Sequence, residues 1–268
     1  MRLEEMVPIS ILLITGSFVT PDAYASIVDG VTGQEIEIRA LHLPTVGVSP
    51  RQGRDGRPPT MYDDAAFIAQ EVDRLADQGK HVILIAHSYG GVPTSQSIQG
   101  RSISDRQRKG QRGGIVRVGY MTALVPEIGH SALDVLAEVP PEGQTQMETD
   151  ENGWMLHSDP AASAKICLSS LPLEESEPLI RELAKHSGVS FTNSLTYAGY
   201  RDVPVSYLLC TADLCVPPAA QRKGIDMIER VSGTKVKVTE VACDHGVNHT
   251  SPGEVVAWIM SVAAEAQS

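Results

Sequence analysis

The stretch HVILIAHSYGG, residues 81–91, decides the fold of this 268-residue chain. From Val82 to Ala86 every residue is apolar, as expected of a central strand that is covered by helices on both faces. Ser88 follows this strand, and Gly90 comes two residues later, a pattern that predicts a sharp turn into a helix. A buried strand that ends in such a turn indicates a parallel sheet in an α/β protein.

Strands and helices are predicted to alternate along most of the chain. Helical periodicity of apolar residues is clearest over 65–76, and further helices are expected from Pro21 onward and over 254–264. The basic segment 101–114 reads as a solvated loop. Further strands are expected near residues 9–14, 35–40, 115–121, 203–209 and 235–241. This alternation predicts a doubly wound, mostly parallel sheet.

Residues 125–200 interrupt the alternation. They contain helix-like pieces at 131–138, 160–170 and 173–186 but no convincing strand. A segment inserted between two strands of a parallel sheet has to lie above the edge of that sheet. We therefore predict a core made of residues 1–124 and 201–268, with residues 125–200 forming a helical lid.

Composition and charge exclude several classes of partner. The net charge of −11 would repel the phosphates of a nucleic acid. The apolar run over residues 7–14 is short, contains Pro8 and follows two glutamates, so we interpret it as a buried strand rather than a signal peptide or membrane span. We therefore expect the protein to be cytoplasmic and to bind neither nucleic acid nor membrane. The sequence does not indicate its oligomeric state.

The sequence contains no metal-binding cluster, nucleotide loop or haem signature, so we expect no cofactor. The four cysteines include no CxxC pair, and free thiols in a reducing compartment are expected. These cysteines are Cys167, Cys210, Cys215 and Cys243.

Ser88 is the candidate nucleophile. A central strand, a serine and then a helix form the context of a nucleophile elbow, whose usual pattern is G-x-S-x-G. Ala86 stands in the first glycine position and Gly90 in the second. The turn holds the serine in a strained conformation at the carboxyl edge of the sheet. An ordinary Ser-Tyr-Gly-Gly turn is the alternative reading, and the partners described next argue against it.

A serine hydroxyl needs a base to remove its proton. In proteins with a nucleophile elbow, the serine, the acid and the histidine follow one another in that order along the chain, and the histidine comes after the last strand. His245 and His249 both occur there. His245 is closer to the strand end and can fold back toward Ser88, so it is the predicted base. His249 is expected on the surface.

The acid should follow the strand that precedes the last strand–helix unit. Asp213 comes just after residues 203–209 and would hold the imidazole in the required tautomer. Glu127 lies beyond the end of its strand, and Asp244 is next to His245 in sequence and poorly placed to orient it. Asp213 is therefore the predicted acid.

An oxyanion hole needs two backbone donors. One is the N–H of Tyr89, the residue after the nucleophile. The helix that begins here also points its N-terminal N–H groups at the site, where they favour negative charge. The other should come from the loop after the first strand, where Ser17 and Phe18 remain equal candidates. Three lid residues are expected either to form an apolar wall of the substrate pocket or to pack the lid onto the body: Trp154, Met155 and Leu156.

Together these motifs resemble the α/β-hydrolase superfamily, especially small lidded members such as plant methylesterases, hydroxynitrile lyases and hydrolases of fungal and bacterial metabolite pathways. The resemblance covers nearly the whole chain. Thr15 stands where the family commonly has histidine, which leaves the second oxyanion donor open. The matching segments are GSFVTP (16–21), MYDDA (61–65), AHSYGG (86–91), LTYAGYRDVP (195–204), and His245 with Pro252 and Glu254.

The resemblance is specific for the fold and the triad and unspecific for the substrate. It implies hydrolysis of an ester, lactone or thioester of a small metabolite through an acyl-Ser88 intermediate. A second reading keeps the triad but uses it for C–C cleavage, elimination or acyl transfer. A third, a ligand receptor on a hydrolase scaffold, is disfavoured by the complete and correctly ordered triad.

Overall fold

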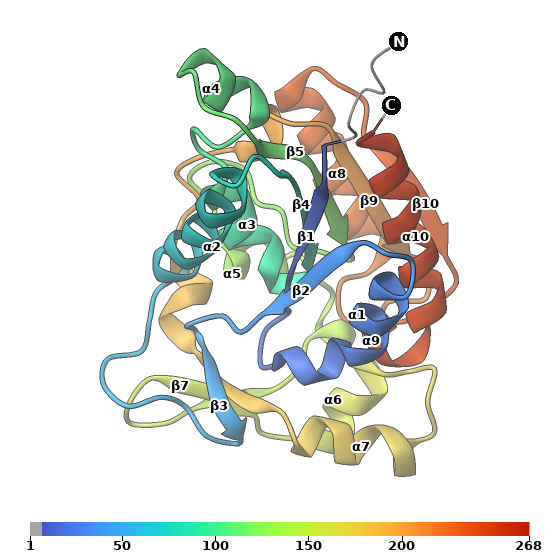
Figure 1. Cartoon of the computed structure of the whole chain (residues 1–268). Coiled ribbons are helices and arrows are strands. Elements are labelled where there is room, and N and C mark those ends of the chain that lie inside the picture. Colours follow the sequence, from blue (N-terminus) through green and yellow to red (C-terminus); the bar gives the residue numbers. More distant parts are fainter. Residues whose placement is uncertain (1–6, 268) are drawn as a thin grey trace.

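The computed structural model describes residues 7–267 and places a six-stranded sheet at the centre of the chain (Figure 1). The strand order is β10-β9-β5-β4-β1-β2, and every neighbouring pair is parallel, which confirms the predicted parallel sheet. The strands are β1 (Ile9–Ile14), β2 (Glu37–Leu41), β4 (His81–His87), β5 (Gly114–Met121), β9 (Val205–Cys210) and β10 (Lys237–Val241).

Helices cover both faces of this sheet. Those packed on one face are α2 (Met61–Ala76), α3 (Gly91–Ser97) and α8 (Pro218–Ser232), and those on the other are α1 (Ala25–Thr32), after the short turn η1 (Pro21–Tyr24), and α10 (Pro252–Glu265). Within β4, Leu84 packs into the first layer while Ile83 and Ile85 pack into the second. Because successive side chains of a strand point to opposite faces, a strand with two buried faces must be apolar throughout.

The order of the strands creates a crevice at the carboxyl ends of β1 and β4. After β1 the chain continues into a helix on one face, and after β4 it continues into α3 on the opposite face. Neighbouring parallel strands whose connections leave in opposite directions form a topological switch point, where α/β proteins bind ligands. The candidate site residues after β1 and β4 therefore face one another.

The insertion, residues 125–200, lies at the end of the sheet where β7 and α6 are labelled in Figure 1. Its helices are α5 (Ala132–Leu136), α6 (Pro160–Cys167) and α7 (Leu173–Arg181). It also contains strands β6 (Met147–Thr149), β7 (Trp154–His157) and β8 (Ala184–Ser187). These strands and β3 (Val46–Pro50) form an antiparallel sheet in the order β3-β8-β7-β6.

The prediction of an insertion without strands was therefore wrong. The predicted helix over 173–186 ends at Arg181, and β8 follows it. Strands of only 3 or 4 residues are too short to show an alternating pattern. Moreover, β8 pairs with β3, which lies far away in the sequence, so local residues carry no sign of the pairing.

The basic segment 101–114 is also more ordered than predicted, because it contains α4 (Ile103–Arg108). The Ser102 hydroxyl caps this helix by accepting from the N–H of Asp105 at 3.1 Å. The buried Arg106 guanidinium donates to Asp77 at 2.6 Å. A cap and an ion pair hold this helix, and neither produces apolar periodicity. Across residues 7–267, no helix combines the length and apolar character needed to cross a membrane.

Candidate active site

Ser88 lies at the turn between β4 and α3. It begins the short 3-10 turn η2 (Ser88–Gly90) with a φ of 53°, in the left-handed region that residues other than glycine rarely adopt. A Cβ added at Gly90 would lie 2.7 Å from the carbonyl oxygen of Thr15, so only glycine fits at this position. The strained turn predicted from the sequence is therefore present.

Gly91 is expected to be as intolerant of a side chain as Gly90. A Cβ there would lie 2.4 Å from the carbonyl oxygen of Leu124, so we expect Gly91→Ala to lower the free energy of unfolding by about 1–3 kcal/mol. Thermal denaturation should show a lower Tm than for the wild type. Gly253→Ala is the matched control, since nothing lies within 4 Å of that position. Equal Tm values for the two variants would contradict the close packing at the elbow.

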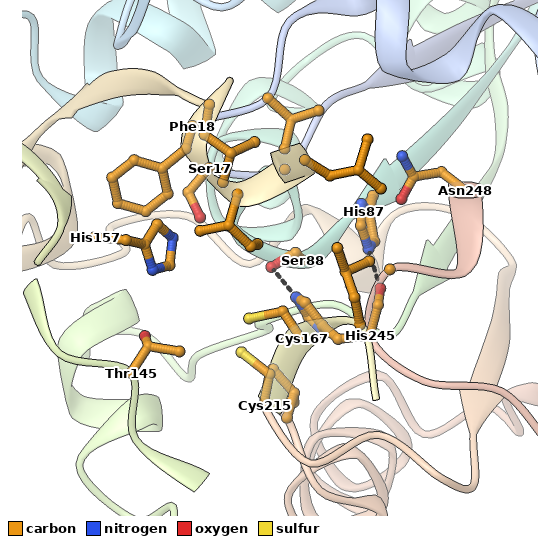
Figure 2. Close-up of a pocket in the computed structure, with 18 of the residues that line it drawn as sticks. Ser17, Phe18, His87, Ser88, Thr145, His157, Cys167, Cys215, His245 and Asn248 are labelled. Carbon is orange, nitrogen blue, oxygen red and sulfur yellow. Dashed lines mark hydrogen bonds between the residues drawn. The ribbon is translucent and has the colours of Figure 1, made fainter. Parts of the chain in front are cut away.

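His245 connects Ser88 to Asp213 in a line of hydrogen bonds. Its Nε2 lies 2.9 Å from the Oγ of Ser88, and its Nδ1 lies 2.7 Å from the Oδ2 of Asp213 (Figure 2 shows the first contact). The imidazole therefore donates from Nδ1 to the carboxylate and leaves Nε2 to accept the Ser88 proton. The structure brings together all three residues predicted to form the triad.

Asp213 accepts hydrogen bonds from several groups besides His245. Its Oδ1 accepts from the backbone N–H groups of Cys215 at 2.7 Å and Val216 at 2.8 Å. Its Oδ2 also accepts from the hydroxyl of Thr122. Asp213 is 1 % exposed, so these donors replace the hydrogen bonds that water would otherwise make to its oxygens. This network fixes the orientation of Asp213.

The other acids that the sequence offered contact different partners. Glu127 pairs with Arg230 at 2.9 Å on the surface. Asp244 accepts from the N–H of Ser170 and the hydroxyl of Thr250, each at 2.8 Å. Neither carboxylate is hydrogen-bonded to His245 in the described structure, which leaves Asp213 as its acidic partner.

Electrostatics favour the protonated form of His245. Burial is the largest single influence on the pKa of this imidazole and lowers it, but the combined effect of its neighbours, led by the Asp213 carboxylate, raises the pKa well above the usual value of 6.5. Since the neutral form is the one that can accept a proton from Ser88, this shift favours base catalysis at alkaline pH.

His87 lies next to the triad and contacts the backbone of His245. Its Nε2 donates to the carbonyl oxygen of His245 at 3.0 Å (Figure 2), so its neutral ring accepts at Nδ1 from the hydroxyl of Tyr24 at 2.7 Å. That hydroxyl in turn accepts from the N–H of Gly16 at 2.9 Å. Burial lowers the pKa of His87 to about 3, which keeps the ring neutral. The chain of bonds ties the loop after β1 to the backbone of His245, and no sequence pattern indicated it.

The loop after β1 resolves the choice between the two candidate oxyanion donors. The N–H of Phe18 donates to Nδ1 of His186 at 3.3 Å, and its carbonyl accepts from the N–H of Ala184 at 3.0 Å. Both backbone groups of Phe18 are therefore bonded to β8. Among the described residues, none accepts a hydrogen bond from the N–H of Ser17. Ser17 is thus the remaining candidate from this loop.

Tyr89 is anchored by its own side chain. Its hydroxyl donates to Oδ2 of Asp64 at 2.9 Å, and Asp64 also accepts from the N–H of Thr45 at 3.0 Å and from its hydroxyl at 2.6 Å. All three residues are fully buried. This network holds the residue that follows Ser88, so the backbone N–H of Tyr89 has a fixed place beside the nucleophile.

Ser88 and His245 open into a cavity of about 130 Å³. Its walls come from the loops after β1, β4, β5, β9 and β10 and from the insertion, and they are mostly apolar. The apolar residues in contact with the cavity include Phe18, Leu124, Leu136, Met147, Leu168, Leu179, Ile180, Leu183 and Phe191. Such a lining suits a small molecule that is largely apolar.

The predicted apolar wall of Trp154, Met155 and Leu156 is not part of this lining, as far as the described residues show. A Cβ added at Gly53 would lie 2.5 Å from the Trp154 ring, and one at Gly188 would lie 3.2 Å from Met155. The Trp154 ring therefore packs the insertion onto the body at Gly53, as the alternative reading of the sequence expected, whereas Met155 packs against Gly188 within the insertion. The next residue, His157, does face the cavity.

The cysteines lie at two places in the structure. Cys167 and Cys215 line the cavity beside His245 (Figure 2). The sulfur atoms of Cys210 and Cys243 lie 3.2 Å apart. All four are free thiols. Within residues 7–267, no cluster of three or more His, Cys, Asp or Glu side chains is arranged to hold a metal ion.

Comparisons with known proteins show the family to which the chain belongs. The sequence model of a family described as "Alpha/beta hydrolase family" matches residues 11–258. A protein named "Probable hydrolase R7", from a Phoma species, is 33% identical over 250 residues, covering 92% of this chain and 96% of the relative. "Alpha/beta hydrolase nvfD" from Aspergillus novofumigatus is 24% identical over 257 residues, covering 96% and 97%.

Solved structures share the fold at low sequence identity. A pyrethroid hydrolase from Sphingobium faniae JZ-2 superposes with a TM-score of 0.73 at 18% identity, covering 96% of this chain and 98% of the other. Polyneuridine aldehyde esterase superposes with a TM-score of 0.68 at 16% identity, covering 96% and 99%. At such identities the likeness concerns the fold alone.

Proposed function

Because the chain belongs to the alpha/beta hydrolase family, we propose that it is a serine hydrolase that cleaves an ester, lactone or thioester of a small metabolite. The observation that carries the proposal is the hydrogen-bonded line from Asp213 through His245 to Ser88. The strained elbow and the mostly apolar cavity support it. Relatives named as hydrolases, and a structural neighbour named as an esterase, agree with it.

In the first half of the proposed reaction, Ser88 attacks the substrate carbonyl while its proton passes to Nε2 of His245. The Asp213 carboxylate stabilises the imidazolium that forms. The backbone N–H groups of Ser17 and Tyr89 donate to the developing oxyanion. The tetrahedral intermediate then collapses, and His245 gives the proton to the leaving oxygen or sulfur.

In the second half, a water molecule enters the cavity and attacks the acyl-Ser88 carbonyl. His245 removes the proton from this water and returns it to Ser88, which releases the acid. The same oxyanion donors serve both halves. The fixed positions of Tyr89 and of the loop after β1 mean that little reorganisation is needed during either step.

A fluorophosphonate probe tests this proposal directly. The intact mass of the purified protein should increase by one probe adduct, and peptide mapping should place the adduct on Ser88. A screen of esters, lactones and thioesters would then identify the bond that is cleaved. A folded protein that takes up no label would contradict an activated serine and favour a ligand receptor. Labelling without hydrolysis of any acyl substrate would favour a lyase or transferase that uses the same triad.

The pH dependence of kcat/KM should reflect the shifted pKa of His245. The base must be neutral, and its pKa is raised above 6.5, so activity is expected to be low in acid and to rise through and above neutral pH. A series of kcat/KM measurements from pH 5 to pH 10 would show the inflection. An acid limb with its midpoint below 6.5 would contradict the electrostatic assignment.

A further inference from the structure

The cavity contains a polar corner, which we define as Ser17, Thr145 and His157. Figure 2 shows these three residues together on the side of Ser88 that is away from His245. His157 ends β7 and is 7 % exposed. The proposed triad chemistry uses the backbone N–H of Ser17 but none of the three side chains of the polar corner, so the role of these side chains requires a separate explanation.

The hydrogen bonds of His157 determine which nitrogen carries its proton. Its Nδ1 lies 2.8 Å from the Oγ of Ser163, a residue with no exposed surface. Within residues 7–267, that hydroxyl has no other acceptor, and a buried hydroxyl needs one. Ser163 therefore donates to Nδ1. Because burial lowers the pKa of His157 to about 4, the ring is neutral at pH 7 and its remaining proton is on Nε2.

The Nε2–H group of His157 faces the cavity without a protein partner in the described structure. The ring cannot easily turn away, because Ser163 holds one edge and the Phe18 ring lies against it with centroids 4.8 Å apart. A largely buried donor that lacks an acceptor costs free energy until a ligand satisfies it. The site is thus prepared for an acceptor atom that a bound molecule supplies.

We propose that His157 is a specificity-determining residue whose Nε2–H binds a second oxygen of the substrate, distinct from the scissile carbonyl. The inference rests on the proposed function and specifies its substrate class, an apolar ester or lactone with an uncharged acceptor oxygen such as a ketone. The neutral ring and apolar walls disfavour a carboxylate, because an ion would lose its hydration without a counter-charge. The hydroxyls of Ser17 and Thr145 provide further contacts for the same oxygen.

Matched pairs of p-nitrophenyl esters test this inference. One pair is pentanoate and 4-oxopentanoate, and another is hexanoate and 5-oxohexanoate, so that each pair differs only in a ketone. We expect the wild type to show a kcat/KM about five- to tenfold higher for the oxo ester of at least one pair. His157→Phe should reduce that ratio to near one, and the ratio is read independently of the variant's rate on the alkanoate ester.

Two further variants make the test specific. His157→Gln keeps an N–H donor and should retain part of the preference. His130→Phe, an exposed histidine of the same insertion, should keep the wild-type ratio. Each ratio is measured on one preparation, so it does not depend on how much of the protein is folded.

An equal ratio in the wild type and His157→Phe, or no preference in either pair, would overturn the inference while hydrolysis itself continued. If no ester is cleaved and Ser88 takes up no fluorophosphonate, the proposed function fails first, and the inference fails with it.

Discussion

Replacing Ser88 with alanine is expected to lower kcat/KM for any ester that the wild type hydrolyses by about 10⁵–10⁶-fold. The variant lacks the atom that forms the acyl intermediate, so only the oxyanion donors and substrate binding could still accelerate the reaction of water. The fold should be retained, because Ser88 is small and its hydroxyl contacts only His245 among the described residues. Initial-rate measurements on freshly purified variant would provide the value.

The triad acts as a unit, so the loss should not be additive. His245→Ala alone should cost about as much as Ser88→Ala, and the double variant should be no worse than either. Ser261→Ala, which changes an exposed serine on α10, is the matched control and should keep wild-type activity. A Ser88→Ala variant within tenfold of the wild type would show that hydrolysis does not proceed through this serine.

Asp213→Asn is expected to lower kcat/KM by about 10⁴-fold, with only a small change in structure. The asparagine oxygen would accept from the N–H groups of Cys215 and Val216, as Oδ1 does now. Its NH₂ group would then face Nδ1 of His245, which would have to become an acceptor. The imidazole proton would move to Nε2, so the base could no longer accept the proton of Ser88.

The same substitution provides a second measurement. Without the Asp213 carboxylate, the strongest influence that raises the pKa of His245 is lost while burial still lowers it, so the midpoint of the acid limb should shift to lower pH. Glu127→Gln is the control, because Glu127 is a candidate acid that follows β5 instead of β9 and pairs with Arg230 on the surface. Near-wild-type activity in Asp213→Asn, or a comparable loss in Glu127→Gln, would contradict the assigned acid.

Much of this protein could be predicted from local sequence. The run from Val82 to Ala86 indicates a strand buried on both faces because each of its residues packs into one of two helical layers. The elbow at Ser88 has a signature because Gly90 must lie beside the backbone of Thr15. Asp213 and His245 could be identified because parallel strands bring the residues after their carboxyl ends to one edge of the sheet.

Other features were decided by contacts between distant segments. Ser17 and Phe18 were equal candidates until the N–H of Phe18 was seen to donate to His186, 168 residues away. The strands of the insertion form because β8 pairs with β3, and the orientation of His157 depends on the Phe18 ring in the loop after β1. A strand or a tight turn requires particular residue types in sequence order, so the sequence alone determined the parallel sheet and the elbow. A hydrogen bond between remote segments places no such requirement on neighbouring residues, so only the tertiary structure distinguished the two candidate oxyanion donors and formed the polar corner of the cavity.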